Sequence, residues 1–277
     1  MVVKATLREG LSPVAIAAFR FFTAGGLFLI VLLLNKIRRR DYVLLVERRD
    51  FPMLLFLALT GVTFFFTIQY TGIQMASASI ASILVCLLAP VITSILSARV
   101  FKEHLSKKQI VGIGIAAVGT LTVIAGGTLG LQGNMVFFLG SLILLSTLFL
   151  WAIYTVGGKK IMDKYSPFLV AAYVNILGGL CLAPFSLAEN SFHEILVMNF
   201  HEWVAILYLA FLCSLLGYFI WFHVITQVRA AVASSFMFAE PLVTVLFAIA
   251  FIGEEITPFV ITGGFLIFIG VYLVSTK

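Results

Sequence analysis

The apolar stretch at residues 228–253 has an acidic residue at its centre, and this combination constrains the chain more than any other feature. It reads VRAAVASSFMFAEPLVTVLFAIAFIG and exceeds the roughly 20 residues that a helix needs to cross a bilayer. Glu240 lies about half-way along. A charge there costs about 2.5 kcal/mol or more, so such residues usually face a partner or a water-filled cavity. Pro241 follows and has no N–H to give to the carbonyl of Met237. We predict that this segment forms one wall of a polar cavity within a membrane.

The composition extends this interpretation to the whole chain. Hydrophobic residues make up 62% of the 277 residues and charged residues only 11%. Soluble domains contain about 45–50% apolar and about 25% charged residues, so a soluble globular fold is excluded. We predict an all-α polytopic membrane protein of the inner or plasma membrane.

The positions of the basic residues predict how the protein is oriented in the membrane. The net charge of +6 could indicate nucleic acid binding, but fifteen of the 18 Lys and Arg residues fall in five places separated by apolar runs. This is the positive-inside pattern, so we place these segments in the cytoplasm, the C-terminus included, and expect no nucleic acid partner. The five places are residues 36–49, 99–108, 159–164, 229 and 277. Residues 189–202 contain no Lys or Arg and are expected outside.

The apolar runs predict nine complete membrane spans and one fragment. Residues 1–7 are too short to span, so we expect about 15 residues of a tenth helix to be absent from the front of this chain. Proline at the first turn of a helix costs little, so Ser12-Pro13 marks a helix start. The expected spans are residues 14–35, 51–73, 76–98, 109–125, 135–156, 168–188, 203–226, 228–253 and 259–275.

The two halves of the chain repeat each other. Adding 151 to a residue number gives five identical pairs without a gap: Pro90 and Pro241, Glu103 and Glu254, Ile110 and Ile261, Gly112 and Gly263, and Gly119 and Gly270. The loop FKEHLSKK of the first half is basic, whereas its counterpart IGEEITP is acidic, so the two lie on opposite sides. With five helices per half, this predicts two inverted-topology repeats, residues 1–127 (first helix truncated) and 135–277, with a site near the midplane between them.

Three segments resemble a known family: residues 12–22, 70–123 and 234–273. A mid-helix Pro, a Glu just past the helix end and a following helix with spaced glycines occur twice. This pattern resembles the drug/metabolite transporter superfamily, in particular EamA-type permeases with ten helices in two inverted repeats. The resemblance implies transport of small organic solutes, such as amino acids or other metabolites, without ATP.

Glu240 and Arg20 are the leading candidate substrate-binding residues. Glu240 is the acidic residue deep in a span, and it either faces the cavity or makes a structural hydrogen bond beside Pro241. Arg20 lies about two turns inside its span and can bind a carboxylate bidentately. The alternative for Arg20 is that its side chain reaches the membrane interface or pairs structurally.

Five further polar or amphipathic residues within spans are assigned to substrate binding: Gln69, Tyr70, Tyr154, Asn175 and Trp221. Tyr and Trp also form belts at membrane interfaces, so each has a structural alternative. Pro90 and Pro241 are assigned as helix breaks that permit gating, because each removes a backbone hydrogen bond.

The other motifs do not indicate a metal-binding, dinucleotide-binding or ATP-binding site. The three cysteines lie within apolar spans without metal-binding spacing, and GIGIAAVG lies in an apolar span with no strand before it. The chain has no GxxxxGK[ST] motif for ATP. We expect no cofactor and no metal site.

These observations favour a secondary transporter that works by alternating access. Glu240 is a candidate for binding a proton, so proton-coupled export is one option for this transporter. A passive channel or lipid scramblase with the same fold is an alternative. An intramembrane lipid enzyme would need a nucleophile–base or metal cluster, and the sequence offers only scattered His and Glu. We expect a transporter rather than an enzyme, with a small-molecule substrate and the lipid bilayer as partners, and the sequence leaves a homodimer open.

Overall fold

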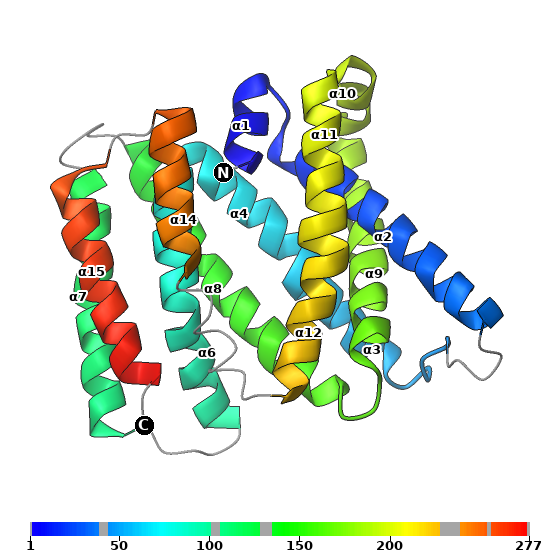
Figure 1. Cartoon of the computed structure of the whole chain (residues 1–277), viewed down its shortest axis with the longest axis horizontal. Helices are drawn as coiled ribbons and strands as arrows, with labels where there is room; N and C mark the ends of the chain where they lie inside the picture. The colour runs from blue at the N-terminus through cyan, green and yellow to red at the C-terminus, as the bar shows by residue number, and fades with distance from the viewer. Residues whose placement is uncertain are drawn as a thin grey trace.

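The computed structural model describes residues 2–38, 44–100, 106–127, 135–227, 239–253 and 256–275, with the backbone alone at residues 90, 94, 97, 98, 126, 127, 195, 239, 242, 252 and 275. Within these ranges the chain is almost entirely helical and contains no β-strand (Figure 1). The all-α fold class that the composition predicts is confirmed.

The first part of the chain forms a short helix and four longer rods. Two of these rods contain a π-helical turn, labelled η, between two α-helical parts. The elements are α1 (Val2–Glu9), α2 (Pro13–Arg38), α3 (Phe51–Ala58), η1 (Leu59–Thr63), α4 (Phe64–Met75), α5 (Ala78–Ala81), η2 (Ser82–Cys86), α6 (Leu87–Val100) and α7 (Lys107–Gly127).

The second part continues in the same way. The elements are α8 (Met135–Ile161), α9 (Pro167–Ala188), α10 (Ser191–Val197), α11 (Phe200–Tyr208), η4 (Leu209–Leu216), α12 (Gly217–Gln227), α14 (Ala239–Phe247), η6 (Ala248–Ile252) and α15 (Pro258–Ser275). Of the expected span at residues 228–253, positions 228–238 lie outside the described residues.

Six stretches are long and apolar enough to cross a membrane: Pro13–Arg38, Phe51–Met75, Lys107–Ala125, Met135–Ile161, Pro167–Ala188 and Phe200–Gln227. Two shorter apolar helices, Ala78–Thr93 and Pro258–Val274, coincide with further expected spans. The protein is therefore a multi-pass membrane protein. The count of nine complete spans stays a prediction.

Ser12-Pro13 begins a helix, as the sequence predicts, and Ser166-Pro167 begins another. The Ser12 hydroxyl accepts a hydrogen bond from the backbone N–H of Ala15 at 3.1 Å, and the Ser166 hydroxyl accepts one from that of Leu169 at 3.3 Å. Each serine thereby satisfies one of the N–H groups that a helix start leaves without a partner.

One end of the bundle carries the basic helix ends. The last turns of α2, α6 and α8 contain Lys or Arg, and α7 begins with two lysines. These ends lie at the lower side of Figure 1, whereas α1 and α10 lie at the upper side. We call the lower side the basic end.

Helices α7 and α15 pack closely through glycines (Figure 1). A Cβ atom added to Gly112 would lie 2.5 Å from the carbonyl oxygen of Gly270, and one added to Gly119 would lie 2.6 Å from that of Gly263. Numbers rise along α7 while those of the partners fall, so the two helices are antiparallel. The four glycines thus let the two backbones approach, which is a common way to pack helices in membranes.

The first prediction concerns this contact. Gly119→Ala should lower the free energy of unfolding by about 1–3 kcal/mol, because its new methyl group meets backbone rather than a movable side chain. Gly114→Ala, on the same helix with nothing within 4 Å, is the control and should be neutral or stabilising. Thermal unfolding in detergent measures both, and equal melting temperatures would contradict the packing role.

Candidate functional site

A cavity of about 510 Å³ lies between helices from both parts of the chain. Its walls come from α2, α4, α5, η2, α8, α11, η4 and α14, with two valines of α1 at the margin. Most of the lining is apolar or aromatic, and seven lining residues have hydroxyl, amide or charged groups: Arg20, Gln69, Tyr70, Ser82, Tyr208, Glu240 and Thr244. The volume lies within the range of about 300–1,000 Å³ that small-molecule sites occupy.

Arg20 is the cationic group of this cavity. Its side chain is only 6% exposed. Its Nε donates a hydrogen bond to the Ser214 hydroxyl at 2.8 Å, and its Nη1 donates one to the Tyr70 hydroxyl at 2.6 Å. The guanidinium carbon also lies 4.5 Å from the ring centroid of Phe66 and 4.9 Å from that of Phe21, within the range of a cation–π interaction. Arg20 is therefore held within the protein by neutral partners, and its role in substrate binding stays a prediction.

Within the described ranges, no acidic side chain forms an ion pair with Arg20. The ion pairs found there involve other residues. A guanidinium has five N–H donors, and the two hydrogen bonds above use two of them. The neutral hydroxyls and ring faces stabilise the buried charge but do not neutralise it. The geometry therefore leaves donors and a net positive charge for an anionic group that enters the cavity.

Glu240 supplies the opposite charge. It is the second residue of α14, and its exposed side chain borders the cavity beside the thiol of Cys86. Pro241, which is buried, is the next residue of the described part of this helix. Whether the helix is broken here depends on residues 228–238, which lie outside the described ranges.

Pro90 lies in α6, four residues beyond the end of η2. A proline cannot donate to the carbonyl four residues earlier, and that residue is Cys86, the last of the π-helical turn. The lost hydrogen bond therefore lies at the end of the π-helical turn. Two such turns, η2 and η4, supply cavity residues, and π-helical turns are frequent at functional sites.

Of the seven predicted substrate-binding residues, four line the cavity: Arg20, Gln69, Tyr70 and Glu240. The other three do not. Asn175 donates from Nδ2 to the Ala171 carbonyl of its own helix at 2.8 Å. The rings of Tyr154 and Trp221 lie 5.5 and 5.2 Å from that of Trp151, which lines the cavity. Tyr154 and Trp221 therefore pack behind the wall, and the role of all three residues in binding stays a prediction.

Three of the four neutral partners of Arg20, Ser214, Phe66 and Phe21, were not predicted from the sequence. The only available signal is Arg20 itself, because a charge in an apolar span requires partners whose positions the sequence does not give.

At the margin of the cavity, α1 is fastened to α4. Lys4 donates from Nζ to the carbonyls of Ile73 at 2.8 Å and Gln74 at 3.2 Å. These carbonyls lie at the end of α4, where a helix leaves its last acceptors without partners. Val2 and Val3 of α1 thereby border the cavity on the side away from the basic end.

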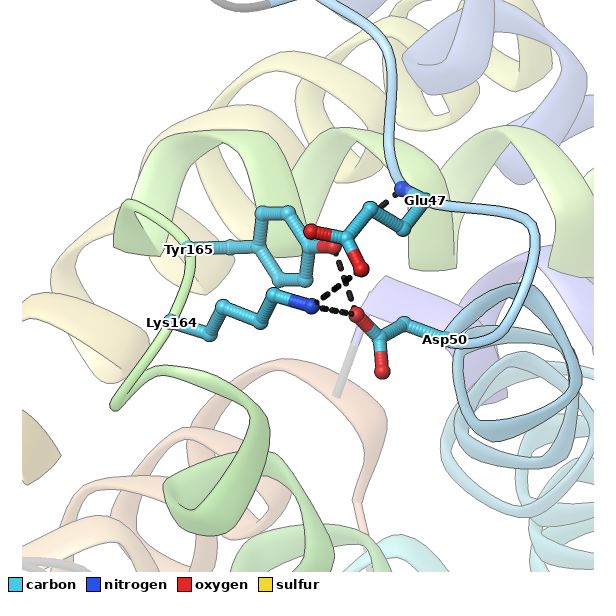
Figure 2. Close-up of polar contacts among 4 residues, drawn as sticks. All are labelled: Glu47, Asp50, Lys164 and Tyr165. Carbon is cyan, nitrogen blue, oxygen red and sulfur yellow. Dashed lines mark hydrogen bonds and ion pairs between the residues drawn. The ribbon is translucent and has the colours of Figure 1, made fainter.

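A second polar group, the Lys164 cluster, consists of Glu47, Asp50, Lys164 and Tyr165 (Figure 2). Lys164 Nζ lies 2.7 Å from Glu47 Oε2 and 2.6 Å from Asp50 Oδ2, and the Tyr165 hydroxyl donates to Asp50 Oδ2 at 2.6 Å. It joins the segment before α3 to the turn between α8 and α9, at the basic end. The sequence analysis missed it, because both segments read as solvated loops.

Contacts within the Lys164 cluster shift the pKa values of Asp50 and Lys164. Hydrogen bonds from Lys164 and then from Tyr165 lower the pKa of Asp50 below its ordinary value. Hydrogen bonds to Asp50 and then to Glu47 raise the pKa of Lys164. Both shifts favour the charged forms that the cluster requires.

Comparison with known proteins identifies the family. The model of the EamA-like transporter family matches residues 1–125 and 138–276. The chain belongs to this family. An uncharacterized transporter of Archaeoglobus fulgidus is 28% identical over 275 residues, covering 99% of this chain and 91% of the relative. A solved structure titled "Crystal structure of protein" superposes with a TM-score of 0.67 at 16% identity, covering 99% of this chain and 91% of that one, and shows the fold alone.

Two other relatives of this EamA-like transporter have more specific names. A "Probable amino-acid metabolite efflux pump" of Salmonella typhimurium is 28% identical, over 65% of this chain and 62% of the relative. A "Probable terminal-alkyne amino-acid exporter" of Streptantibioticus cattleyicolor is 24% identical, over 83% of this chain and 74% of the relative.

The second prediction tests the support of Arg20. Tyr70→Phe should lower the free energy of unfolding by about 1.5–3 kcal/mol, because it removes a buried hydrogen bond to a charged group. Tyr154→Phe is the matched control. Tyr154 is equally buried, and its hydroxyl has no hydrogen-bond partner among the described residues, so its loss should be nearly neutral. Thermal unfolding in detergent compares them, and equal losses would refute the assignment.

Proposed function

We propose that this EamA-like transporter is a secondary carrier of amino acids or related zwitterionic metabolites that works by alternating access. The observation that carries this proposal is the buried Arg20, which has no acidic partner within the described ranges, in the same cavity as Glu240. Arg20 would bind the substrate carboxylate, and Glu240 would bind the ammonium group. Each charge of the substrate then replaces water around a side chain of opposite charge.

The remaining walls fit the side chain of such a substrate. Phe65, Phe66 and Trp151 line the cavity with aromatic surface, and Gln69 adds a polar group. Sites for small molecules combine apolar walls with a few polar groups that fix the orientation. The names of the Salmonella and Streptantibioticus relatives support the same substrate class and direction, because they mention amino acids and export.

In this proposal the Lys164 cluster would act as the gate at the basic end. The cavity is bordered by α1 and the end of α4 on the other side of the bundle, and the cluster joins the two segments at the basic end. In an inverted repeat the two halves would rock about the midplane site, and this cluster would open and close once per cycle. By the positive-inside rule, the basic end would be cytoplasmic.

Proton coupling would run through Glu240. A carboxylate that accepts either a proton or the substrate ammonium, but not both, makes substrate release depend on protonation. Inward movement of a proton would then drive export of the substrate.

The third prediction tests both charges in proteoliposomes by counterflow of a neutral aliphatic amino acid and of its carboxamide. The wild type should carry the amino acid but not the carboxamide. Arg20→Lys should reduce counterflow of the amino acid about tenfold to hundredfold, because Lys cannot bind a carboxylate bidentately. Glu240→Gln should abolish the pH dependence of transport.

The control for this experiment is Trp221→Phe, which alters the layer behind the cavity and should keep the preference for the carboxylate. Equal transport of amino acid and carboxamide by the wild type would contradict the substrate class. Flux that does not saturate would instead indicate a channel.

The fourth prediction concerns the Lys164 cluster. Lys164→Gln should increase labelling of Cys86 and Cys213, which line the cavity, by a membrane-impermeant maleimide added at the basic end. Lys160→Gln, an exposed lysine one turn earlier, is the matched control. A Cys181→Ser background removes the third cysteine. Equal labelling of the two variants would exclude the gate.

The same assay gives a pH dependence. The pKa of Asp50 is lowered, so its contribution to closure is full above the ordinary Asp value and is lost as the pH falls through the lowered one. The pKa of Lys164 is raised, so its contribution is full below the ordinary Lys value and is lost as the pH rises through the raised one. The ratio of labelling in Lys164→Gln to labelling in the wild type should stay constant from about pH 5 to about pH 9, because the pH dependence of thiolate reactivity is common to both proteins.

A further inference from the structure

A second cavity, of about 520 Å³, lies on the outer side of the bundle between α6, α7 and α8. We propose that it holds one acyl chain of an anionic phospholipid, whose phosphate is bound by basic residues at the basic end. This groove is separate from the cavity that contains Arg20, and the two share no lining residue.

The groove has the chemistry of lipid rather than of a polar ligand. Helix α7 contributes a stripe at helical spacing: Ile113, Ala116, Ala117, Thr120, Leu121 and Ile124. Helices α6 and α8 contribute similar stripes within residues 88–95 and 138–149. The hydroxyl of Thr120, the one polar side chain of the lining, donates to the Ala116 carbonyl at 2.8 Å, so no polar group is left for a hydrophilic ligand.

The groove opens to the bilayer. Leu121 and Phe149 in its walls are 68% and 60% exposed in the protein alone. Its length also fits. The α7 stripe runs over twelve residues from Ile113 to Ile124, or about 16 Å at the helical rise. One leaflet of the hydrocarbon core is about 15 Å thick, so the groove can take one acyl chain.

Positive charge at one end of the groove specifies the headgroup. Arg99 lies one turn beyond Ile95 on α6, and Lys107 and Lys108 lie one to two turns before Ile113 on α7. Lys107 and Lys108 are exposed, as is Arg99, and none of the three makes an ion pair within the described ranges. The distance of one to two turns accommodates the glycerol and ester groups, and the long side chains reach the phosphate. Net negative charge on the lipid complements three cations.

Native mass spectrometry of the purified full chain tests the proposal, with phosphatidylglycerol and phosphatidylcholine of identical acyl chains added in turn. The wild type should retain one phosphatidylglycerol at least about tenfold better than phosphatidylcholine. Ala117→Trp fills the groove and should lose the adduct. Val118→Trp, on another face of the same helix, is the matched control and should keep it.

The triple variant Arg99→Gln/Lys107→Gln/Lys108→Gln should bind both lipids equally, with retention of phosphatidylglycerol reduced about tenfold or more. Arg48→Gln, an exposed charge at the basic end away from the groove, is its control. These surface changes leave the packed core intact, so they test the site even if a tryptophan variant fails to fold.

Equal retention of the two lipids by the wild type would overturn the proposal, and so would equal retention by the two tryptophan variants. Loss of a dimer rather than of a lipid adduct in Ala117→Trp would overturn it by assigning the groove to a second copy of this chain.

Discussion

The rest of the structure depends on how a cation is kept inside a bundle surrounded by lipid. Arg20 is held by two hydroxyls and two aromatic faces instead of a carboxylate. These groups come from α2, α4 and η4, so three rods must meet at one depth for the charge to be tolerated. A carboxylate partner would stabilise the charge more, but it would also neutralise it. The neutral arrangement stabilises the fold less than an ion pair would, but it leaves the positive charge available to bind a ligand.

Irregular backbone lies where this convergence occurs. Ser214 is in η4, and Ser82 and Cys86 are in η2, both π-helical. A π-helical turn rotates the following residues relative to an α-helix, so side chains that would face lipid can face inward. The bilayer otherwise requires every backbone group to be satisfied within its helix, which makes such turns tolerable mainly where they border a cavity.

The sequence predicts the helical class, most of the long helices and the helix start at Ser12-Pro13, because apolar runs and helix caps are local signals. It also identifies Arg20 and Glu240, since charges in apolar spans are conspicuous. It does not separate Gln69 and Tyr70, which line the cavity, from Tyr154, Asn175 and Trp221, which do not. Which face of a helix turns inward depends on crossing angles and π-helical turns, and neither follows from hydrophobicity when all faces are apolar. The Lys164 cluster was missed because it joins loops far apart in the chain.

The two ends of the protein are fastened by different chemistry. The Lys164 cluster relies on carboxylates, whose charge disappears in strong acid. At the other end, Lys4 binds the carbonyls of Ile73 and Gln74, and an amide oxygen keeps its acceptor strength from acid to base. Acidic surroundings therefore loosen one fastening and spare the other. In an acidic compartment the protein would therefore lose the ion pairs at its basic end, whereas the contact between α1 and α4 at the opposite end would persist.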